Sequence, residues 1–113
     1  MSADARPEYQ AVRHVLTAPQ IAHRTAQYIH ADDFDFAGLE GEVATMSGGE
    51  ALLIRVAREL WLAEACVGLS ALVHRLDPVS FERVLDALRA GRGYDLRAGA
   101  ADFVEARRPG VAA

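Results

Sequence analysis

The strongest constraint on the fold of this chain is a helix-start signal at Ser47-Gly48-Gly49-Glu50. In such a capping box the serine hydroxyl accepts a hydrogen bond from the amide three residues on, and the glutamate carboxylate accepts one from the serine amide. Apolar residues then recur at three- and four-residue spacing, which places them on one face of an α-helix. They are Leu53, Val56, Ala57, Leu60 and Val67. We therefore predict a central helix over about residues 48–66.

Further capping signals and apolar stripes predict short helices on both sides of the central one. Thr17-Ala18-Pro19-Gln20 repeats the capping-box spacing, Asp35 precedes a short helical stripe, and Asp77-Pro78 is typical of an N-cap followed by a first-turn proline. Gly91 is expected to end the helix that starts at Pro78 in the left-handed conformation. The predicted helices cover residues 7–16, 18–31, 36–46, 69–76, 78–90 and 96–107.

The fold class that follows is all-α, a compact bundle of five or six short helices around the central helix, because no segment alternates polar and apolar residues for long enough to indicate a strand. The chain has 113 residues and is 51% hydrophobic, which is enough for one core without disulfides or a structural metal. We expect a single helical domain over 1–113, with 1–6 and 109–113 as disordered tails. Cys66 has no cysteine partner and is expected to fill the core.

Composition also suggests a source and a location. All twelve basic residues are arginine and alanine is abundant, which is typical of a GC-rich bacterial genome. No apolar stretch reaches the roughly 18 residues needed to cross a bilayer, because charged residues between Arg55 and Glu64 interrupt the most apolar region. The first seven residues lack a signal-peptide core. We therefore expect a cytoplasmic protein without a membrane partner.

Charge is divided unevenly along the chain. Residues 1–54 carry three Arg against eight acidic residues, whereas residues 55–113 carry nine Arg against eight acidic residues. Residues 69–93 superficially resemble a helix-turn-helix, an arrangement that many DNA-binding proteins use. The second helix would present acidic and basic residues together, and such a face repels phosphate as much as it attracts it. DNA binding through 69–93 is therefore an alternative function. The mixed face comprises Glu82, Arg83, Asp86 and Arg89.

Two short motifs lie at the starts of the central helix and of the helix at Pro78. The first is Met46-Ser47-Gly48-Gly49-Glu50 and the second is Leu76-Asp77-Pro78. The segment 46–90 thereby resembles ABC-type ATPases, in which such motifs are the signature motif and the D-loop. The positions that correspond to the magnesium-binding aspartate and the catalytic glutamate are Ser70 and Ala71, and the chain has neither a G-x-x-x-x-G-K-[ST] loop nor any lysine. We therefore predict no ATP hydrolysis by that mechanism and interpret the segment as two well-capped helices.

A group of imidazole and carboxylate side chains near residue 30 has the chemistry that several divalent metals prefer. The group is His23, His30, Asp32 and Asp33. The two histidines are two helical turns apart, roughly 10 Å, which is too far for both rings to reach one ion. His14 and His74 have no catalytic partner that the sequence places near them. We predict no metal, no cofactor and no catalytic residue. An enzyme or ligand carrier with a pocket that the sequence does not reveal is a second alternative.

The remaining feature is a surplus of apolar residues outside the main stripes. Leu62 falls on the charged side of the central helix beside Trp61, while Phe34 and Phe36 lie within the acidic stretch 32–42. Complete burial within the monomer would account for them equally well, but extra apolar surface on a small helical domain marks an interface more often than a ligand pocket. We predict a non-catalytic, regulatory or protein–protein interaction module that binds a protein partner or forms a homodimer, through these four residues or through the helix 78–90.

Overall fold

The computed structural model describes residues 6–93, which contain six α-helices, one short 3₁₀-helix and an isolated β-bridge between Ile29 and Phe34. The predicted all-α class is confirmed. The helices are α1 (Pro7–Leu16), α2 (Ala22–Thr25), the 3₁₀-helix η2 (Ala26–Tyr28), α3 (Phe36–Val43), α4 (Gly48–Leu62), α5 (Leu69–Arg75) and α6 (Pro78–Gly91). No helix in these residues is long and apolar enough to cross a membrane. The predicted helix 96–107 and tail 109–113 lie outside the described residues.

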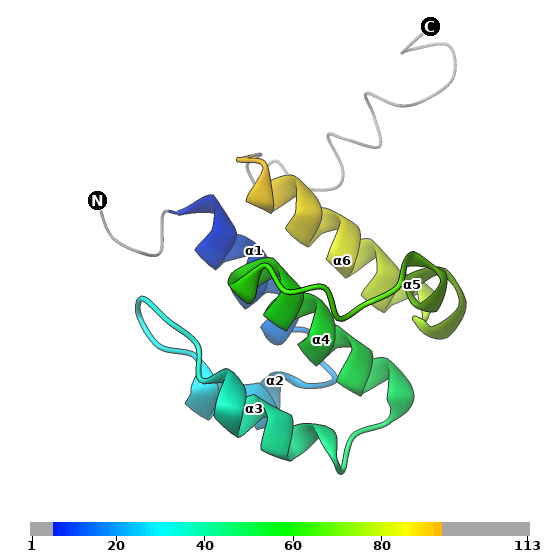
Figure 1. Ribbon diagram of the computed structural model, residues 1–113, viewed down its shortest axis with the longest axis horizontal. Helices are drawn as coiled ribbons and strands as arrows, with labels where there is room; N and C mark the ends of the chain where they lie inside the picture. Colours follow the sequence, from blue (N-terminus) through cyan, green and yellow to red (C-terminus); the bar gives the residue numbers. More distant parts are fainter. Residues whose placement is uncertain (1–5, 94–113) are drawn as a thin grey trace, which may run out of the picture.

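The three longest helices form the body of the bundle (Figure 1). α1 packs extensively against both α4 and α6, whereas α4 and α6 touch each other only slightly. α1 and α6 run antiparallel, with Arg83 bonded to the carbonyls of His14 and Thr17 and with Gly91 beside Ala11. α2 and α3 lie on the far side of α4 from α6. Because α4 contacts α1, α3, α5 and α6, its predicted central position is confirmed.

The start of α4 is confirmed and its end differs from the prediction. The Ser47 hydroxyl accepts from the Glu50 amide at 3.2 Å, and the Glu50 carboxylate accepts from the Ser47 amide at 2.9 Å, so both bonds of the capping box form. The helix stops at Leu62 and not near residue 66, because Ala63 takes a left-handed conformation with φ of 57°. That conformation ends the helical hydrogen bonding and reverses the chain.

After α4 the chain runs back along the outer side of that helix. Glu59 Oε1 accepts from the amides of Cys66 and Val67 at 3.0 and 2.9 Å, and the Cys66 thiol donates to the Arg55 carbonyl at 3.2 Å. Cys66 is exposed on this return segment, so the expectation that it fills the core is wrong. Partial burial of its sulfur and the nearby Glu59 raise the pKa of the thiol, which keeps it protonated.

The capping box expected at Thr17 does not form. The Thr17 hydroxyl instead donates to the Arg13 carbonyl at 2.8 Å and accepts from Arg83 of α6, and the Gln20 side chain donates to the hydroxyl of Ser80. The next helix therefore starts at Ala22, without a side-chain cap, and after one turn it continues as a 3₁₀-helix. The single helix predicted to reach residue 31 is wrong because α6 engages the side chains that would have capped it.

The core lies between α1, α3, α4 and α6. Tyr9, Val12 and Leu16 of α1 are buried. The apolar spacing of Phe81, Val84, Leu85 and Leu88 predicts the buried side of α6, but of these four residues only Val84 is buried. The buried residues of α6 are Ser80, Val84, Ala87 and Ala90. Small side chains allow α6 to approach α1 closely, and a Cβ added at Gly91 would lie 3.7 Å from the Ala11 Cβ. The left-handed residue after α6 is Gly93, with φ of 94°, so the prediction for Gly91 is also wrong.

Candidate interaction surface

Two of the four predicted partner-binding residues lie inside the fold. Phe34 is 5% exposed and Phe36 7% exposed. Phe34 stacks on Tyr9 with 4.8 Å between ring centroids and meets the Trp61 ring edge-on at 5.0 Å. These contacts pull the acidic loop before α3 onto α1 and α4. The expectation that both phenylalanines lie on an accessible face is therefore corrected, because they form part of the core.

Trp61 is half-buried and holds the same loop. Its indole Nε1 donates to Asp33 Oδ1 at 3.1 Å, and the Arg6 guanidinium lies 5.5 Å from the centroid of its ring. Arg6 also donates to the Asp32 carbonyl at 3.4 Å, so the prediction that it belongs to a disordered tail is wrong. Leu62 is 42% exposed at the end of α4. Trp61 thus packs within the chain, and of the four residues Leu62 has the most accessible side chain.

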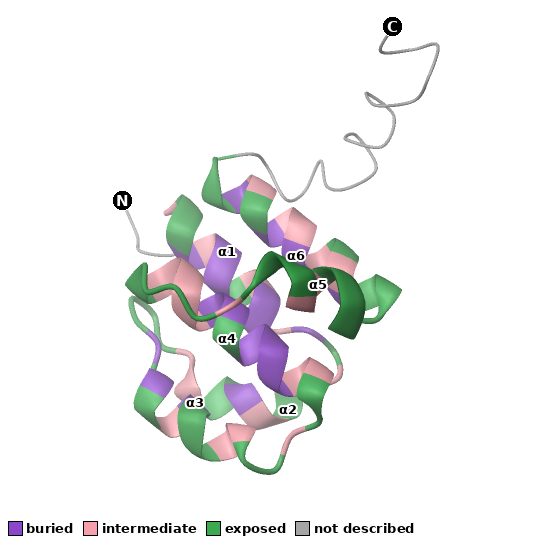
Figure 2. Ribbon diagram, turned by 45° about the vertical axis from the view of Figure 1, so that its right-hand side comes forward, coloured by how far each residue is buried: buried purple, intermediate pink, exposed green. Residues whose placement is uncertain are grey.

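The three most exposed large apolar side chains of residues 6–93 lie on α5 and at the start of α6, where Val79 is 69% exposed. Leu69 is 80% exposed and Val73 is 62% exposed. Leu72 and Leu76, on the other side of the same apolar stripe, are half-buried against the core. α5 contains no buried residue at all, and it stands out as an exposed helix in Figure 2. The sequence predicts this helix from its apolar stripe, but the stripe does not show which side the rest of the chain covers.

One side of α6 continues this apolar surface. Phe81, Leu85 and Leu88 share a side of the helix because they are spaced by four and three residues. Leu88 is 44% exposed, and Phe81 and Leu85 are half-buried. α5 leads into the start of α6 through Leu76 and Asp77, although the two helices make few contacts with each other. We refer to the exposed or half-buried residues Leu69, Val73, Phe81, Leu85 and Leu88 as the α5–α6 face.

The arginines within α6 pair with other groups of the chain. Arg83 donates to the His14 carbonyl at 2.7 Å and to the Thr17 carbonyl at 3.2 Å. Arg89 donates to Asp86 at 3.1 Å. A helix that reads DNA needs such cations on its outer side to reach phosphates. The arrangement of α6 therefore gives little support to the helix-turn-helix alternative.

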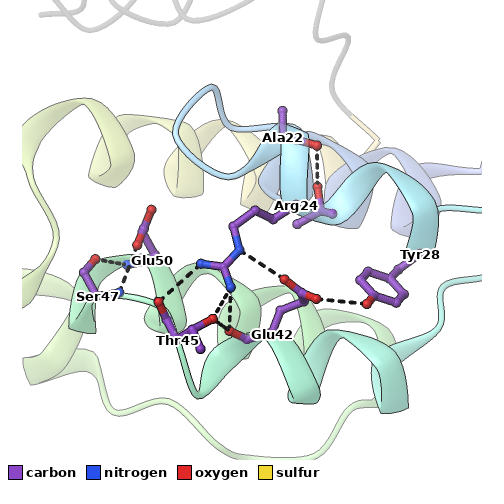
Figure 3. Close-up of polar contacts among 8 residues, drawn as sticks. Ala22, Arg24, Tyr28, Glu42, Thr45, Ser47 and Glu50 are labelled. Carbon is purple, nitrogen blue, oxygen red and sulfur yellow. Dashed lines mark hydrogen bonds and ion pairs between the residues drawn. The ribbon is translucent and has the colours of Figure 1, made fainter.

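A polar cluster around Arg24 fixes the turn that precedes α4 (Figure 3). The Arg24 guanidinium pairs with the Glu42 carboxylate at 3.1 Å and donates to the backbone carbonyls of Glu42 and Thr45 at 3.2 and 3.3 Å. Tyr28 donates to the other Glu42 oxygen at 3.1 Å, and burial together with this bond raises the pKa of Tyr28. Because Arg24 satisfies carbonyls at the end of α3, we assign the cluster a structural role.

An open polar depression lies where the N-termini of α4 and α6 meet. Its lining residues are Gln20, Ser47, Gly49, Glu50 and Asp77. The Asp77 carboxylate accepts from the Ser80 amide at 3.2 Å, just as Glu50 accepts from Ser47. These hydrogen bonds lower the pKa of both carboxyl groups. The positive ends of both helices are thus already occupied by carboxylates of the chain, which leaves no reason to place an anion there.

His14 is a half-buried histidine of α1. Its Nε2 is buried, lies 3.8 Å from Asp86 Oδ2 and has no hydrogen-bond partner among residues 6–93. Burial lowers the pKa of His14, Arg83 lowers it further, and Asp86 acts in the opposite direction. The imidazole lies between α1 and α6 and is half-buried. Among residues 6–93 no group of three or more His, Cys, Asp or Glu could hold a metal ion.

Comparison with known proteins gives no further guide to the function. No protein-family model matches the chain, and neither a curated protein nor a solved structure is significantly similar to it. No family model supports the resemblance of segment 46–90 to ABC-type ATPases, and in this fold its two motifs contain the N-caps of α4 and α6.

Proposed function

We propose that this protein is a non-catalytic protein–protein interaction module that contacts its partner through the α5–α6 face. The observation that carries the proposal is a seven-residue helix with no buried residue, whose Leu69 is 80% exposed. Burying an exposed Leu or Val side chain contributes roughly 1.5–3 kcal/mol. A partner that covers Leu69 and Val73 gains this free energy and also orders a helix too short to be stable by its own hydrogen bonds.

The alternatives have less support from the described residues. A DNA-binding role through 69–93 would use α6, whose Arg83 and Arg89 are engaged within the chain. An enzyme or ligand carrier would need a pocket with convergent functional groups, whereas the depression at the helix N-termini is open and its carboxylates cap their own helices. We place the proposed module in the cytoplasm, where the exposed thiol of Cys66 would stay reduced.

Affinity capture from the source cells with three baits tests the proposal. The baits are the wild-type chain, a Leu69→Ser/Val73→Ser double variant, and Leu62→Ser as a control with an exposed leucine on another helix. We expect at least one protein, which could be an untagged copy of this chain, to be retained by the wild type and the control and lost with the double variant. Identical capture by all three baits would contradict the proposal. Loss of capture with the Leu62→Ser bait alone would instead place the partner contact at the end of α4.

A further inference from the structure

We propose that the partner of the α5–α6 face is a second copy of this chain, with the α6 helices of the two copies packed antiparallel about a two-fold axis. This inference rests on the proposed function and names its partner. Residues 69–93 contain four Arg and three acidic residues, so two such surfaces meet with little net repulsion. Residues 29–50, in contrast, contain six acidic residues and no arginine, so two copies of that region would repel each other.

The apolar residues of α6 have the spacing that helix pairs use. Phe81, Leu85 and Leu88 alternate four- and three-residue steps, the repeat that keeps a seam of side chains facing a second helix. Val84, Ala87 and Ala90 occupy a different side of the helix and face α1. α6 therefore has two apolar sides, of which the chain buries the one with small residues. A helix with apolar residues over so wide an arc is typically covered on both sides.

The charged residues next to the seam favour the antiparallel direction. Arg92 continues the seam spacing after Leu88, and Glu82 directly follows Phe81; both are exposed. In a parallel two-fold pair each of these charges would meet its own copy. In an antiparallel pair, Leu85 of one copy faces Leu88 of the second copy, and Arg92 lies across Phe81 and next to Glu82 of the second copy. Arg92 thus makes a cation–π contact with Phe81 and an ionic contact with Glu82 of the second copy, and the two-fold axis repeats both contacts.

The α5 helices also fit this arrangement. Each α5 ends next to the start of its own α6, separated from it by Leu76 and Asp77, so an antiparallel pair brings α5 toward the end of α6 of the second copy. Leu69, Val73 and Leu88 are among the most exposed large apolar side chains of residues 6–93, and exposed apolar side chains that gather on one side of a monomer are often functional. The pairing covers these three side chains in both copies.

Sedimentation velocity and light scattering on the full chain at micromolar concentration test the pairing. We expect a mass of twice 12.2 kDa for the wild type. Leu88→Glu should give a monomer, whereas Leu62→Glu, at a similarly exposed leucine, should leave the dimer intact. Glu82→Arg and Arg92→Glu should each weaken the dimer by about tenfold or more, and the double variant Glu82→Arg/Arg92→Glu should restore most of the affinity. Circular dichroism of each variant checks that the fold is retained.

The outcomes separate this inference from the proposed function. A wild-type chain that stays monomeric overturns the inference, while capture that depends on Leu69 and Val73 would still support a different protein partner. A dimer that Leu88→Glu leaves intact, or a charge reversal that the double variant does not rescue, overturns the antiparallel α6 pair. A monomer whose capture is also insensitive to Leu69 and Val73 contradicts both proposals.

Discussion

The half-buried imidazole of His14 makes the stability of this protein depend on pH. Burial and Arg83 lower the pKa of His14 from its ordinary value of 6.5, so the unfolded chain binds a proton more readily than the folded one. The stability contributed by neutral His14 is then fully present above pH 6.5 and is lost as the pH falls below that value. We expect chemical denaturation at decreasing pH to show a falling free energy of unfolding.

His14→Gln should make this pH dependence shallower. His23→Gln, at an exposed histidine of α2, is the matched control and should leave the slope unchanged. An identical slope for His14→Gln and the wild type would show that other groups, and not this imidazole, cause the loss of stability in acid.

The N-cap at Ser47 is a second case in which one residue contributes to the stability of the fold. Because its hydroxyl accepts from the Glu50 amide at the start of the longest helix, Ser47→Ala should lower the free energy of unfolding by about 1 kcal/mol. Urea denaturation measures this change. Ser70→Ala, at an exposed serine of α5, should have a much smaller effect. Equal effects of the two substitutions would mean that the capping box does not stabilise α4.

Two glycines of α3 provide a matched test of close packing. A Cβ at Gly38 would lie 2.6 Å from Tyr28 Cδ1 and 2.8 Å from Asp35 Oδ2, whereas no atom of the described residues lies within 4 Å of a Cβ at Gly41. We expect Gly38→Ala to cost about 1–3 kcal/mol, because the Tyr28 ring must move away from Glu42. Gly41→Ala should be neutral or stabilising by up to about 1 kcal/mol. Thermal unfolding of both variants distinguishes these outcomes, and equal melting temperatures would contradict the prediction.

At the scale of the element, the helices differ in how much of each is buried. α1 buries half of its ten residues, and α5 buries none of its seven. Local opening free energies follow buried contacts, so the α5 amides should exchange with deuterium far faster than those of α1. Hydrogen exchange followed by mass spectrometry measures both segments in one experiment. Addition of a bound partner should slow exchange in α5, and protection of free α5 equal to that of α1 would show that this helix is docked more firmly than its exposure indicates.

The helix starts were predictable where the signal is local. Ser47, Asp35 and Asp77 each cap a helix through an amide three residues away, so a few consecutive residues determine the outcome. Thr17 does not cap the next helix because its hydroxyl accepts a hydrogen bond from Arg83, which is distant in sequence. The buried side of α6 was also unpredictable, because the helix has two apolar sides and periodicity does not say which one another helix will approach. The side of α6 with small residues is the buried one, because small side chains allow the helix to approach α1 closely.

The aromatic cluster was missed for a similar reason. Phe34 stands among acidic residues, which suggested an exposed loop, but Tyr9 and Trp61 come from two other helices and bury it. In the sequence these rings are far apart, and no local pattern joins them. The exposed side of α5 was likewise indistinguishable from a buried stripe, because exposure depends on whether the rest of the chain covers it.

At the scale of the whole molecule, the core and the α5–α6 face are apolar for different reasons. Leu53 is fully buried, so Leu53→Ala should lower the free energy of unfolding by about 2–5 kcal/mol. Leu69→Ser/Val73→Ser removes exposed side chains and should change it by no more than about 0.5 kcal/mol, provided that denaturation is measured at a concentration where the chain is monomeric. A loss of several kcal/mol in the double variant would mean that Leu69 and Val73 hold the monomer together, and the face would then be part of the fold and not a surface kept for a partner.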